Sequence, residues 1–400
     1  MTRRVVLEAS HAVAEAVKMA DVDCIAAYPI TPQTHIPERL AEMVADGDLD
    51  AAYIPVESEH SAMSAVLGSA AVGARSFTTT AAQGLALMLE AVYIASSHRY
   101  PIVMAVANRA LSAPISIWCD HSDAMMARDV GWIQVFCQNN QEAFDMTLWG
   151  FRVGEDKDVM FPVMVHLDGF TLSHVTEPLL LPSQRDVDRF LPKYDYRLAL
   201  RPESPTSHGG FGLPDIYTEV KYAQEVALRD ARRTIDKAWD EYADIFGRRY
   251  SALEGYKTDG ADTLILTMGS LGETAQMVVD RKRADGMAVG SLNLRLWRPF
   301  PFADLKEAVK GVKTLIVLDR AFSYGGPGGP VASEIRSALY DIAERPHVVG
   351  FVGALGGRDL DTGTFEYMID RGREISEKGI ECLYEPLLVR GLETGTVVRG

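Results

Sequence analysis

The sequence predicts an α/β fold built on a parallel sheet. Short apolar runs with the composition of strands alternate with segments whose apolar residues recur every three to four positions. Most of the expected strands are continuously apolar, which is typical of parallel strands buried between helices. A chain of 400 residues that is 47% hydrophobic and 24% charged is long enough for two or three cores. We therefore expect two α/β domains joined by a connector.

The first expected domain covers residues 1–185. Its strands are expected at residues 24–28, 52–56, 76–80, 102–107, 132–136 and 161–166. Its helices are expected at residues 8–19, 37–45, 59–72, 85–96 and 141–153. Gly73 stands where the third of these helices would end. This order predicts a sheet of about six strands.

The connector is expected at residues 186–258 and the second, smaller domain at residues 259–385. Prolines and glycines interrupt the chain between residues 182 and 214, and a charged helical stretch follows at about residues 215–250. In the second domain we expect strands at residues 263–268, 289–294, 314–318 and 348–352. Its helices are expected near residues 273–283, 303–309, 329–342 and 364–377. Residues 386–400 are expected to form a C-terminal tail.

Composition argues against several classes of partner. The formal net charge of −15 disfavours a nucleic-acid partner, because binding to a phosphate backbone needs a basic surface. No apolar run approaches the roughly 20 residues that cross a bilayer, so we expect no membrane association. The N-terminus lacks the apolar stretch of a secretion signal, which predicts a cytoplasmic protein. The four cysteines form no C-x-x-C pair, so buried thiols are expected and an iron–sulfur cluster or structural zinc in this chain is not.

Common nucleotide-binding and hydrolase motifs are missing. The sequence has no G-x-x-x-x-G-K-[ST] loop, no G-x-G-x-x-G after the first strand, no G-x-S-x-G elbow and no H-E-x-x-H helix. Residues 325–330 (Gly-Gly-Pro-Gly-Gly-Pro) follow a strand and precede a helix. They are either a phosphate loop or a tight packing turn, and the two prolines, which lack N–H donors, favour the turn.

Polar residues do gather after the strands of the first domain, at the edge where open parallel sheets bind ligands. Residues 28–32 (Tyr-Pro-Ile-Thr-Pro) follow the first strand, and their two prolines stiffen a turn that carries Thr31. Thr31 is either a ligand-binding hydroxyl or the cap of the next helix.

Glu57 and Glu59 stand between the second strand and an apolar helix. An acid at a helix start is favoured by the helix dipole, and that explanation suffices for Glu57. Glu59 differs, because the helix behind it, with Ala62 and Val66, is expected to be buried all round and to hold the carboxylate at a dry interface. Glu59 is therefore a candidate to hydrogen-bond a ring nitrogen.

Arg109 follows the fourth strand and precedes residues 120–123 (Asp-His-Ser-Asp). An arginine beside a pocket suits a substrate carboxylate, because its two parallel donors match the two oxygens. A structural ion pair with Asp120, Asp123 or Asp129 is the competing interpretation. Asp120, His121 and Asp123 have no further well-spaced ligand, so a hydrogen-bonded loop is expected there and a metal site is not.

Taken together, these segments resemble the alpha subunit of the archaeal-type pyruvate:ferredoxin oxidoreductases, members of the thiamine-diphosphate-dependent 2-oxoacid:ferredoxin oxidoreductase family. The likeness spans nearly the whole chain. It rests on residues 28–32, 58–60 (Ser-Glu-His), 79–84 (Thr-Thr-Ala-Ala-Gln-Gly), 107–111 (Ala-Asn-Arg-Ala-Leu), 120–123 and 128–133 (Arg-Asp-Val-Gly-Trp-Ile), with 296–301 and 318–320 in the second half. It implies a thiamine-diphosphate-binding fold of the pyrimidine type, followed by a transketolase C-terminal-like domain.

The resemblance also implies roles for individual residues. Glu59 matches the glutamate that hydrogen-bonds the pyrimidine ring of the cofactor and promotes formation of its reactive carbanion. Pro29, Ile30 and Thr31 match the turn beside the cofactor. Thr31 and Arg109 match the residues that receive the 2-oxoacid, with Arg109 pairing with its carboxylate. Glu59, Thr31 and Arg109 are therefore the expected catalytic set.

The family's division of labour implies that this chain carries only part of an active site. A beta subunit would hold the diphosphate and Mg²⁺, gamma and delta subunits of ferredoxin-like type would hold [4Fe-4S] clusters, and ferredoxin and coenzyme A would be the reaction partners. The Gly-Asp-Gly diphosphate motif is absent here, as this division requires. Asp120, His121 and Asp123 are expected to lie behind the residues that touch substrate and cofactor.

Two alternatives to a pyruvate-specific enzyme stay open. The same machinery serves other 2-oxoacids, such as oxalate, phenylglyoxylate or a branched-chain acid. A non-catalytic scaffold that binds a partner but no cofactor is the second alternative, and the presence of Thr31, Glu59 and Arg109 together argues against it.

Overall fold

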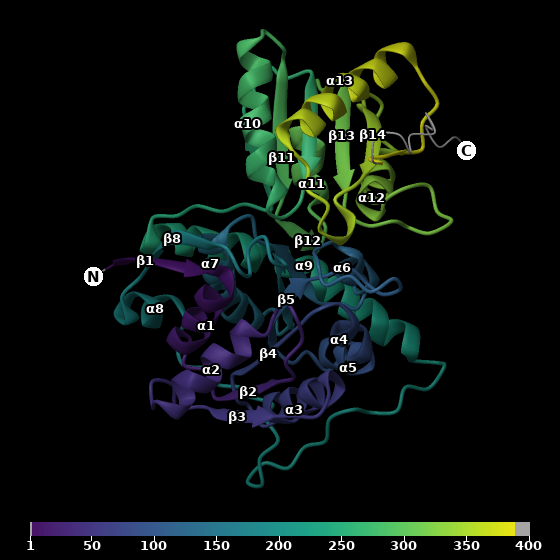
Figure 1. The fold of residues 1–400 in the computed structure, drawn as a ribbon. Helices are drawn as coiled ribbons and strands as arrows, with labels where there is room; N and C mark the ends of the chain where they lie inside the picture. The colour runs from purple at the N-terminus through teal and green to yellow at the C-terminus, as the bar shows by residue number, and fades with distance from the viewer. Residues whose placement is uncertain (1, 389–400) are drawn as a thin grey trace. The chain divides into compact units, whose positions relative to one another are not determined.

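The computed structural model describes residues 2–388, which form two compact units (Figure 1). The first unit takes the chain up to Asn108, then Met126–Ser251 and Leu296–Pro299. The second takes Arg109–Met125, Ala252–Arg295 and residues 300–388. Of the expected tail, residues 386–400, those from 389 on lie outside the described residues. No helix in the described part of the chain has both the length and the apolar character needed to cross a bilayer.

The first unit is built on a seven-stranded sheet in the order β12-β6-β7-β5-β4-β2-β3. Its strands are β2 (Cys24–Ala27), β3 (Ala52–Pro55), β4 (Ser76–Thr80), β5 (Val103–Asn108), β6 (Ile133–Phe136), β7 (Val163–Asp168) and β12 (Leu296–Arg298). All neighbours pair in parallel except β12, which joins β6 antiparallel. The six strands predicted from the first half are therefore confirmed, and β12 adds a seventh.

Helices cover both faces of this sheet. They are α1 (Ala9–Met19), α2 (His35–Ala45), α3 (Glu59–Ala71), α4 (Ala82–Leu87), α5 (Leu89–His98) and α7 (Asn140–Gly154). On one face, α3 and α5 share a core with Met104 and Met164 of the sheet. On the other, α7 packs closely enough that a side chain at Gly150 would touch Val103 and Val163. Alternate strand residues thus point to opposite helix layers, as in a doubly wound sheet.

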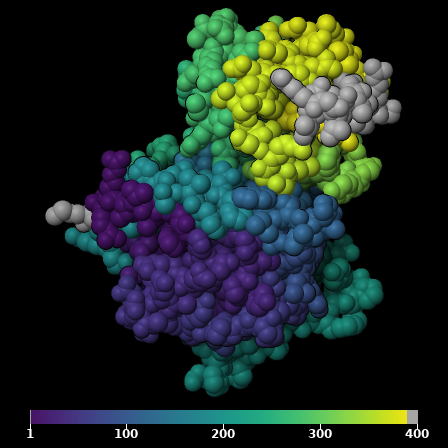
Figure 2. Space-filling model, in the orientation of Figure 1, coloured from purple at the N-terminus to yellow at the C-terminus, as the bar shows by residue number. Residues whose placement is uncertain are grey.

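Two features of the first unit differ from the sequence prediction. The expected helix at residues 85–96 is two helices, α4 and α5, which meet at Met88. An antiparallel pair that was not predicted joins β1 (Arg3–Glu8) to β8 (Thr176–Leu181). Strand β1 is largely exposed at the surface of the unit near the N-terminus (Figure 2). Its exposure explains why it lacks the apolar composition of the central strands.

The long helix α9 (Tyr217–Phe246) belongs to the first unit, although the sequence assigned its residues to a connector. Trp239 of α9 stacks on Trp149 of α7 with ring centroids 5.1 Å apart. The fully buried Asp145 of α7 accepts hydrogen bonds from the hydroxyls of Tyr242 (2.7 Å) and Tyr250 (2.5 Å) and from the guanidinium of Arg248. These contacts fasten α9 to the layer that covers the sheet. A short helix, α8 (Gln184–Phe190), also packs on α9.

The second unit is a six-stranded sheet in the order β15-β14-β13-β10-β11-β9. Its strands are β9 (Leu253–Tyr256), β10 (Thr263–Thr267), β11 (Val289–Leu294), β13 (Thr314–Asp319), β14 (His347–Val352) and β15 (Glu385–Pro386). Its helices are α10 (Leu271–Ala284), α11 (Phe302–Ala308), α12 (Pro330–Leu339) and α13 (Thr362–Lys378), with α6 (Ser122–Met126) at its boundary and a 3-10 turn at Leu355–Gly357. The four strands and four helices predicted here are confirmed, and β9 and β15 extend the sheet at its edges. Helices α10 and α13 share one core with β10, β11, β13 and β14.

Candidate active site

Three neighbouring strands of the first unit, β3, β2 and β4, bring their carboxyl ends to one edge of the sheet. Thr31 lies four residues beyond the end of β2, and Glu59 lies four residues beyond the end of β3. Thr80 is the last residue of β4. Parallel strands open their ligand sites at this edge. The structure therefore places Thr31 and Glu59 at the carboxyl-end edge of the sheet.

Thr31 stands in an exposed turn before α2. The N-cap residue of α2 is Thr34, and the helix begins at His35. Thr31 is therefore not the cap of this helix, which was the alternative interpretation of its position. Pro29 and Thr31 are exposed and Ile30 is half-buried, so this turn presents its surface outward.

Glu59 is the first residue of α3 and is only 6% exposed. The hydroxyl of Ser58 accepts the N–H of Ser61 at 3.2 Å and caps the helix. The buried positions of Ala62 and Val66 show that α3 presents an apolar face behind the carboxylate, as its composition predicts. Glu57 contrasts with it: this carboxylate is exposed, and the hydrogen bond from the Ser61 hydroxyl (2.5 Å) lowers the pKa of Glu57.

Gly84 in α4 lies against Glu59 and Thr80, and these three residues form one corner of the first unit. A Cβ atom at residue 84 would come within 2.7 Å of Glu59 Oε1 and 2.5 Å of Thr80 Oγ1. The hydroxyl of Thr80 is buried and has no hydrogen-bond partner among the described residues. Sequence reasoning assigned no role to Thr80 or Gly84, although residues 79–84 were part of the resemblance. A glycine inside the first turn of a helix after a buried strand was the available signal.

This corner fits the aminopyrimidine ring that the resemblance implies. A buried carboxylate suits a ring nitrogen that exchanges a proton, because burial keeps water from competing for the hydrogen bond. The unpartnered Thr80 hydroxyl offers a second polar contact beside the Glu59 carboxylate. Glu59, Thr80 and Gly84 are the residues that would hold the ring.

Arg109 belongs to the second unit and is 8% exposed. Its Nε donates to the carbonyl of Ser116 at 3.0 Å, which orients the guanidinium. Its backbone N–H donates to Oδ2 of Asp123 at 3.0 Å, and Asp123 is fully buried. Asp123 thus supports Arg109 through the main chain.

Asp120 and His121 organise the loop that leads to α6. The carboxylate of Asp120 accepts the N–H (2.9 Å) and hydroxyl (2.6 Å) of Ser122 and the N–H of Gly356 (3.3 Å). The backbone N–H of His121 donates to the carbonyl of Arg320 at 2.9 Å. These bonds attach the segment Arg109–Met125 to loops at the carboxyl side of the second sheet. The arrangement is the hydrogen-bonded loop that the sequence predicts.

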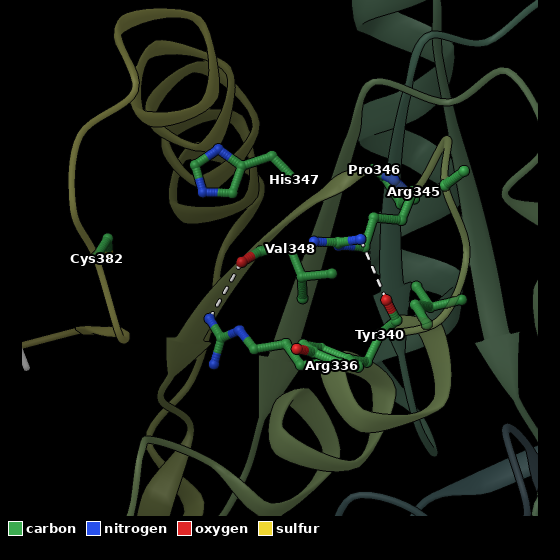
Figure 3. A pocket seen from close by; sticks show the side chains of 9 residues that line it. Arg336, Tyr340, Arg345, Pro346, His347, Val348 and Cys382 are labelled. Atoms are coloured by element: carbon green, nitrogen blue, oxygen red, sulfur yellow. Dashed lines mark hydrogen bonds between the residues drawn. The ribbon is translucent and has the colours of Figure 1, made fainter.

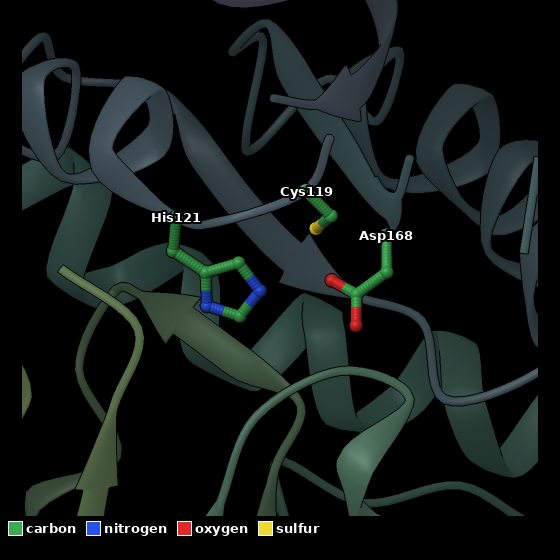
Figure 4. Close-up of side chains that lie close together, drawn as sticks. All are labelled: Cys119, His121 and Asp168. Carbon is green, nitrogen blue, oxygen red and sulfur yellow. The ribbon is translucent and has the colours of Figure 1, made fainter. Parts of the chain in front are cut away.

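No disulfide joins the four cysteines, all of which lie in the described part of the chain. Cys24, Cys119 and Cys137 are buried, and Cys382 is half-buried. Figure 4 shows Cys119 and His121 on the loop before α6, in the second unit, and Asp168 at the end of β7, in the first.

The glycine-rich segment 325–330 is a packing turn. The carboxylate of Asp319 accepts the N–H groups of Val331 (2.8 Å) and Ala332 (3.0 Å), the donors that a bound phosphate would need. A Cβ atom at Gly329 would lie 2.0 Å from Cγ of Asp319, so only glycine allows this approach. The side chain of Asp319 therefore occupies the helix N-terminus itself.

A pocket of about 540 Å³ lies in the second unit between the end of α12 and the start of β14 (Figure 3). Arg336, Arg345 and His347 contribute cationic or titratable groups to it, beside apolar walls such as Leu339 and Val348. Arg336 donates to the carbonyl of Val348 at 3.1 Å, and Arg345 donates to the carbonyl of Tyr340 at 3.1 Å. None of the predicted site residues lines this pocket.

Comparison with known proteins identifies the family. Residues 15–240 match the family described as pyruvate flavodoxin/ferredoxin oxidoreductase, thiamine diphosphate-binding, and residues 261–365 match pyruvate:ferredoxin oxidoreductase core domain II. Pyruvate synthase subunit PorA of Methanothermobacter thermautotrophicus is 47% identical over 92% of this chain and 94% of its own length. Ketoisovalerate oxidoreductase subunit VorA of Pyrococcus abyssi is 42% identical over 94% of this chain and 94% of its own length.

Solved structures show the same fold at lower identity. The 2-oxoglutarate:ferredoxin oxidoreductase from Magnetococcus marinus aligns with a TM-score of 0.70 at 20% identity, over 93% of this chain and 65% of that longer chain. A split-gene transketolase aligns with a TM-score of 0.55 at 12% identity, over 92% of this chain and 99% of that one. The fold is thus the thiamine-diphosphate-binding α/β type with a transketolase-like second unit, and the chain belongs to the pyruvate:ferredoxin oxidoreductase family.

Proposed function

We propose that this chain is the alpha subunit of a pyruvate:ferredoxin oxidoreductase, which converts pyruvate and coenzyme A to acetyl-CoA and CO₂ and reduces ferredoxin. The observation that carries the proposal is the buried Glu59 carboxylate, set against Gly84 and Thr80 at the ligand edge of a thiamine-diphosphate-type domain. The 47% identity to a pyruvate synthase subunit over nine-tenths of the chain supports pyruvate as the substrate.

In this proposal the buried Glu59 side chain hydrogen-bonds the pyrimidine nitrogen and exchanges a proton with it. Pro29, Ile30 and Thr31 form the turn beside the ring, and the Thr31 hydroxyl hydrogen-bonds the 2-oxoacid. Thiamine diphosphate, when bound, supplies the nucleophilic carbon and the electron sink for decarboxylation. Arg109 receives the substrate carboxylate with two parallel donors.

Partner subunits complete the proposed enzyme. A beta subunit would bind the diphosphate and Mg²⁺, and gamma and delta subunits would carry the [4Fe-4S] clusters that pass electrons to ferredoxin. The cysteine content of this chain supports that division, because it has four cysteines and no C-x-x-C spacing for a cluster. The proposed location is the cytoplasm, where such an assembly meets pyruvate and coenzyme A.

A branched-chain 2-oxoacid is the second candidate substrate. The relative named ketoisovalerate oxidoreductase subunit VorA is 42% identical over nearly the whole chain, only slightly less than the pyruvate synthase subunits. Oxalate and phenylglyoxylate are further alternatives within the same chemistry. A non-catalytic scaffold is less well supported, because Glu59 is buried and makes no ion pair with another of the described residues.

The test is to purify the intact assembly from native cells and measure thiamine, magnesium and iron, then assay a panel of 2-oxoacids with coenzyme A and ferredoxin. We expect bound thiamine diphosphate, iron in partner chains and the highest kcat/KM with pyruvate. A higher kcat/KM with 2-oxoisovalerate would replace pyruvate with a branched-chain substrate. An assembly without thiamine and without decarboxylation would leave the scaffold role.

A further inference from the structure

We propose that Gln33 is a positioning residue for 2-oxoacid binding, because its side chain closes the turn that presents Thr31. The inference rests on the proposed function, in which the Thr31 hydroxyl contacts the substrate. It concerns a residue two positions further along the chain that does not itself touch substrate.

Gln33 joins both ends of this turn. Its backbone N–H donates to the carbonyl of Ile30 at 2.9 Å, which closes the turn across Thr31. Its side-chain Nε2 donates to the carbonyl of Tyr28 at 2.7 Å, at the point where the chain leaves β2. The side chain is fully buried, so no water competes for this bond. Thr31 itself is exposed and projects from a loop that Gln33 ties down at two points.

Gln33 is in turn held by the segments on either side of it. Pro32 is buried, and a Cβ atom at Gly169 would lie 2.6 Å from its ring and 2.4 Å from the carbonyl oxygen of Asn108. Only a glycine at residue 169 therefore leaves room for this ring. After Gln33, α2 begins at His35, whose Nδ1 lies 2.6 Å from Oε1 of Glu8.

The Gln33 side-chain amide can be removed while the packing of Pro32 against Gly169 and the start of α2 at His35 are kept. A single buried hydrogen bond stabilises a folded conformation by about 1 kcal/mol, and a free-energy change of that size alters an equilibrium constant several-fold. Without the Nε2 bond, the Tyr28 carbonyl loses its partner and the turn samples other conformations. A turn that samples other conformations weakens the binding of the ground-state substrate more than it slows the chemical step.

The test is Gln33→Met in the assembled enzyme, because methionine keeps the length of the side chain and removes the amide. We expect the KM for pyruvate to rise about three- to tenfold, with kcat within about twofold of wild type. Gln134→Met is a matched control from the same unit. Gln134 is also fully buried, and its Nε2 also donates to a backbone carbonyl, that of Ala127, at 2.9 Å.

The control separates positioning from general destabilisation. Both variants should lose similar thermal stability, and only Gln33→Met should raise KM. An unchanged KM in Gln33→Met, or an equal rise in both variants, would overturn the proposal. Thr31→Ala is measured alongside: if the wild-type assembly turns over pyruvate and this variant leaves KM unchanged, the positioning role fails while the proposed enzyme activity stands. Absence of pyruvate turnover in the wild-type assembly would instead remove the proposed function.

Discussion

Gly84 lies against Glu59 so closely that a methyl group at residue 84 would come within 2.7 Å of the carboxylate oxygen Oε1. The same methyl group would come within 2.5 Å of the Thr80 hydroxyl. Real Cβ atoms do not approach other atoms so closely, so one of the three residues has to move. Glu59 therefore keeps its position because residue 84 has no side chain.

Gly84→Ala should displace the Glu59 carboxylate and reduce thiamine-dependent decarboxylation by about a hundredfold, the effect of misplacing a catalytic group by about 1 Å. We expect a loss of stability of about 1–3 kcal/mol from the overpacked corner. Steady-state turnover of pyruvate by the assembled enzyme and thermal unfolding provide the two measurements.

Gly68→Ala is the matched control for that substitution. Gly68 lies in α3, the helix that begins with Glu59, and a Cβ atom there would meet nothing within 4 Å. Alanine at an open helix position gains about 0.5–1 kcal/mol relative to glycine. The control should thus be slightly stabilised and fully active. Equal activity in the two variants would mean that the corner around Gly84 does not hold the catalytic carboxylate.

Glu59→Gln should abolish most turnover while leaving the fold intact. The amide has the size of the carboxylate but cannot share a proton with a ring nitrogen, so we expect kcat to fall about 10²- to 10⁴-fold. Glu57→Gln, two residues earlier, changes an exposed carboxylate and should leave kcat unaffected. The measurement is pyruvate-dependent CO₂ release, with the bound thiamine of each assembly quantified. Near-normal rates in Glu59→Gln would remove this residue from the mechanism.

Arg109→Ala should weaken substrate capture more than catalysis. If the guanidinium pairs with a desolvated substrate carboxylate, its loss costs about 2 to 5 kcal/mol of binding. The KM for pyruvate should rise accordingly, and kcat should change less. Arg109→Lys is the informative companion, because lysine keeps the charge and loses both the parallel donors and the Nε bond to Ser116. An unchanged KM combined with lower stability would assign Arg109 to the structure of its loop instead.

Most strands of the first sheet were predictable because they are buried and rich in apolar or β-branched residues. Strand β12 was not, since it has three residues and its pairing with β6, through Leu296 and Val135, includes a shift in register. The β1–β8 pair was also missed: β1 is largely exposed, and β8 contains Pro178, which is unusual inside a strand. These elements depend on partners distant in the chain, which local periodicity does not reveal.

The candidate site was also only partly predictable from the sequence. The burial of Glu59 followed from the apolar helix behind it, whereas its contact with Gly84 depends on how α4 approaches α3. The packing role of residues 325–330 was favoured by their prolines, but the group that fills the helix N-terminus, Asp319, became visible only in the structure. Side-chain contacts across the fold therefore account for most of what the sequence left open.

Asp319 should make the stability of the protein depend on pH near neutrality. Burial raises the pKa of Asp319 to about 7, although the N–H groups of Ala332 and Val331 oppose the shift. Between the unfolded pKa of about 3.9 and this value, the folded state holds a proton that the unfolded state has released. Stability should therefore fall as the pH rises from about 4 to 7 and then level off, by an amount on the order of 4 kcal/mol.

Asp319→Asn should flatten this pH dependence, because the amide does not ionise. Its absolute stability will differ from wild type, because asparagine has one acceptor oxygen where aspartate has two, so either Val331 or Ala332 loses its N–H acceptor. The slope is therefore the quantity to measure. Asp280→Asn is the control: Asp280 is paired with Lys257, which lowers the pKa of Asp280, and its titration lies below the window tested. Urea unfolding of the purified chain at pH 5, 6, 7 and 8 distinguishes the variants. A slope in Asp319→Asn equal to that of wild type would show that another group titrates, and that the Asp319 carboxylate caps α12 in its ionised form throughout.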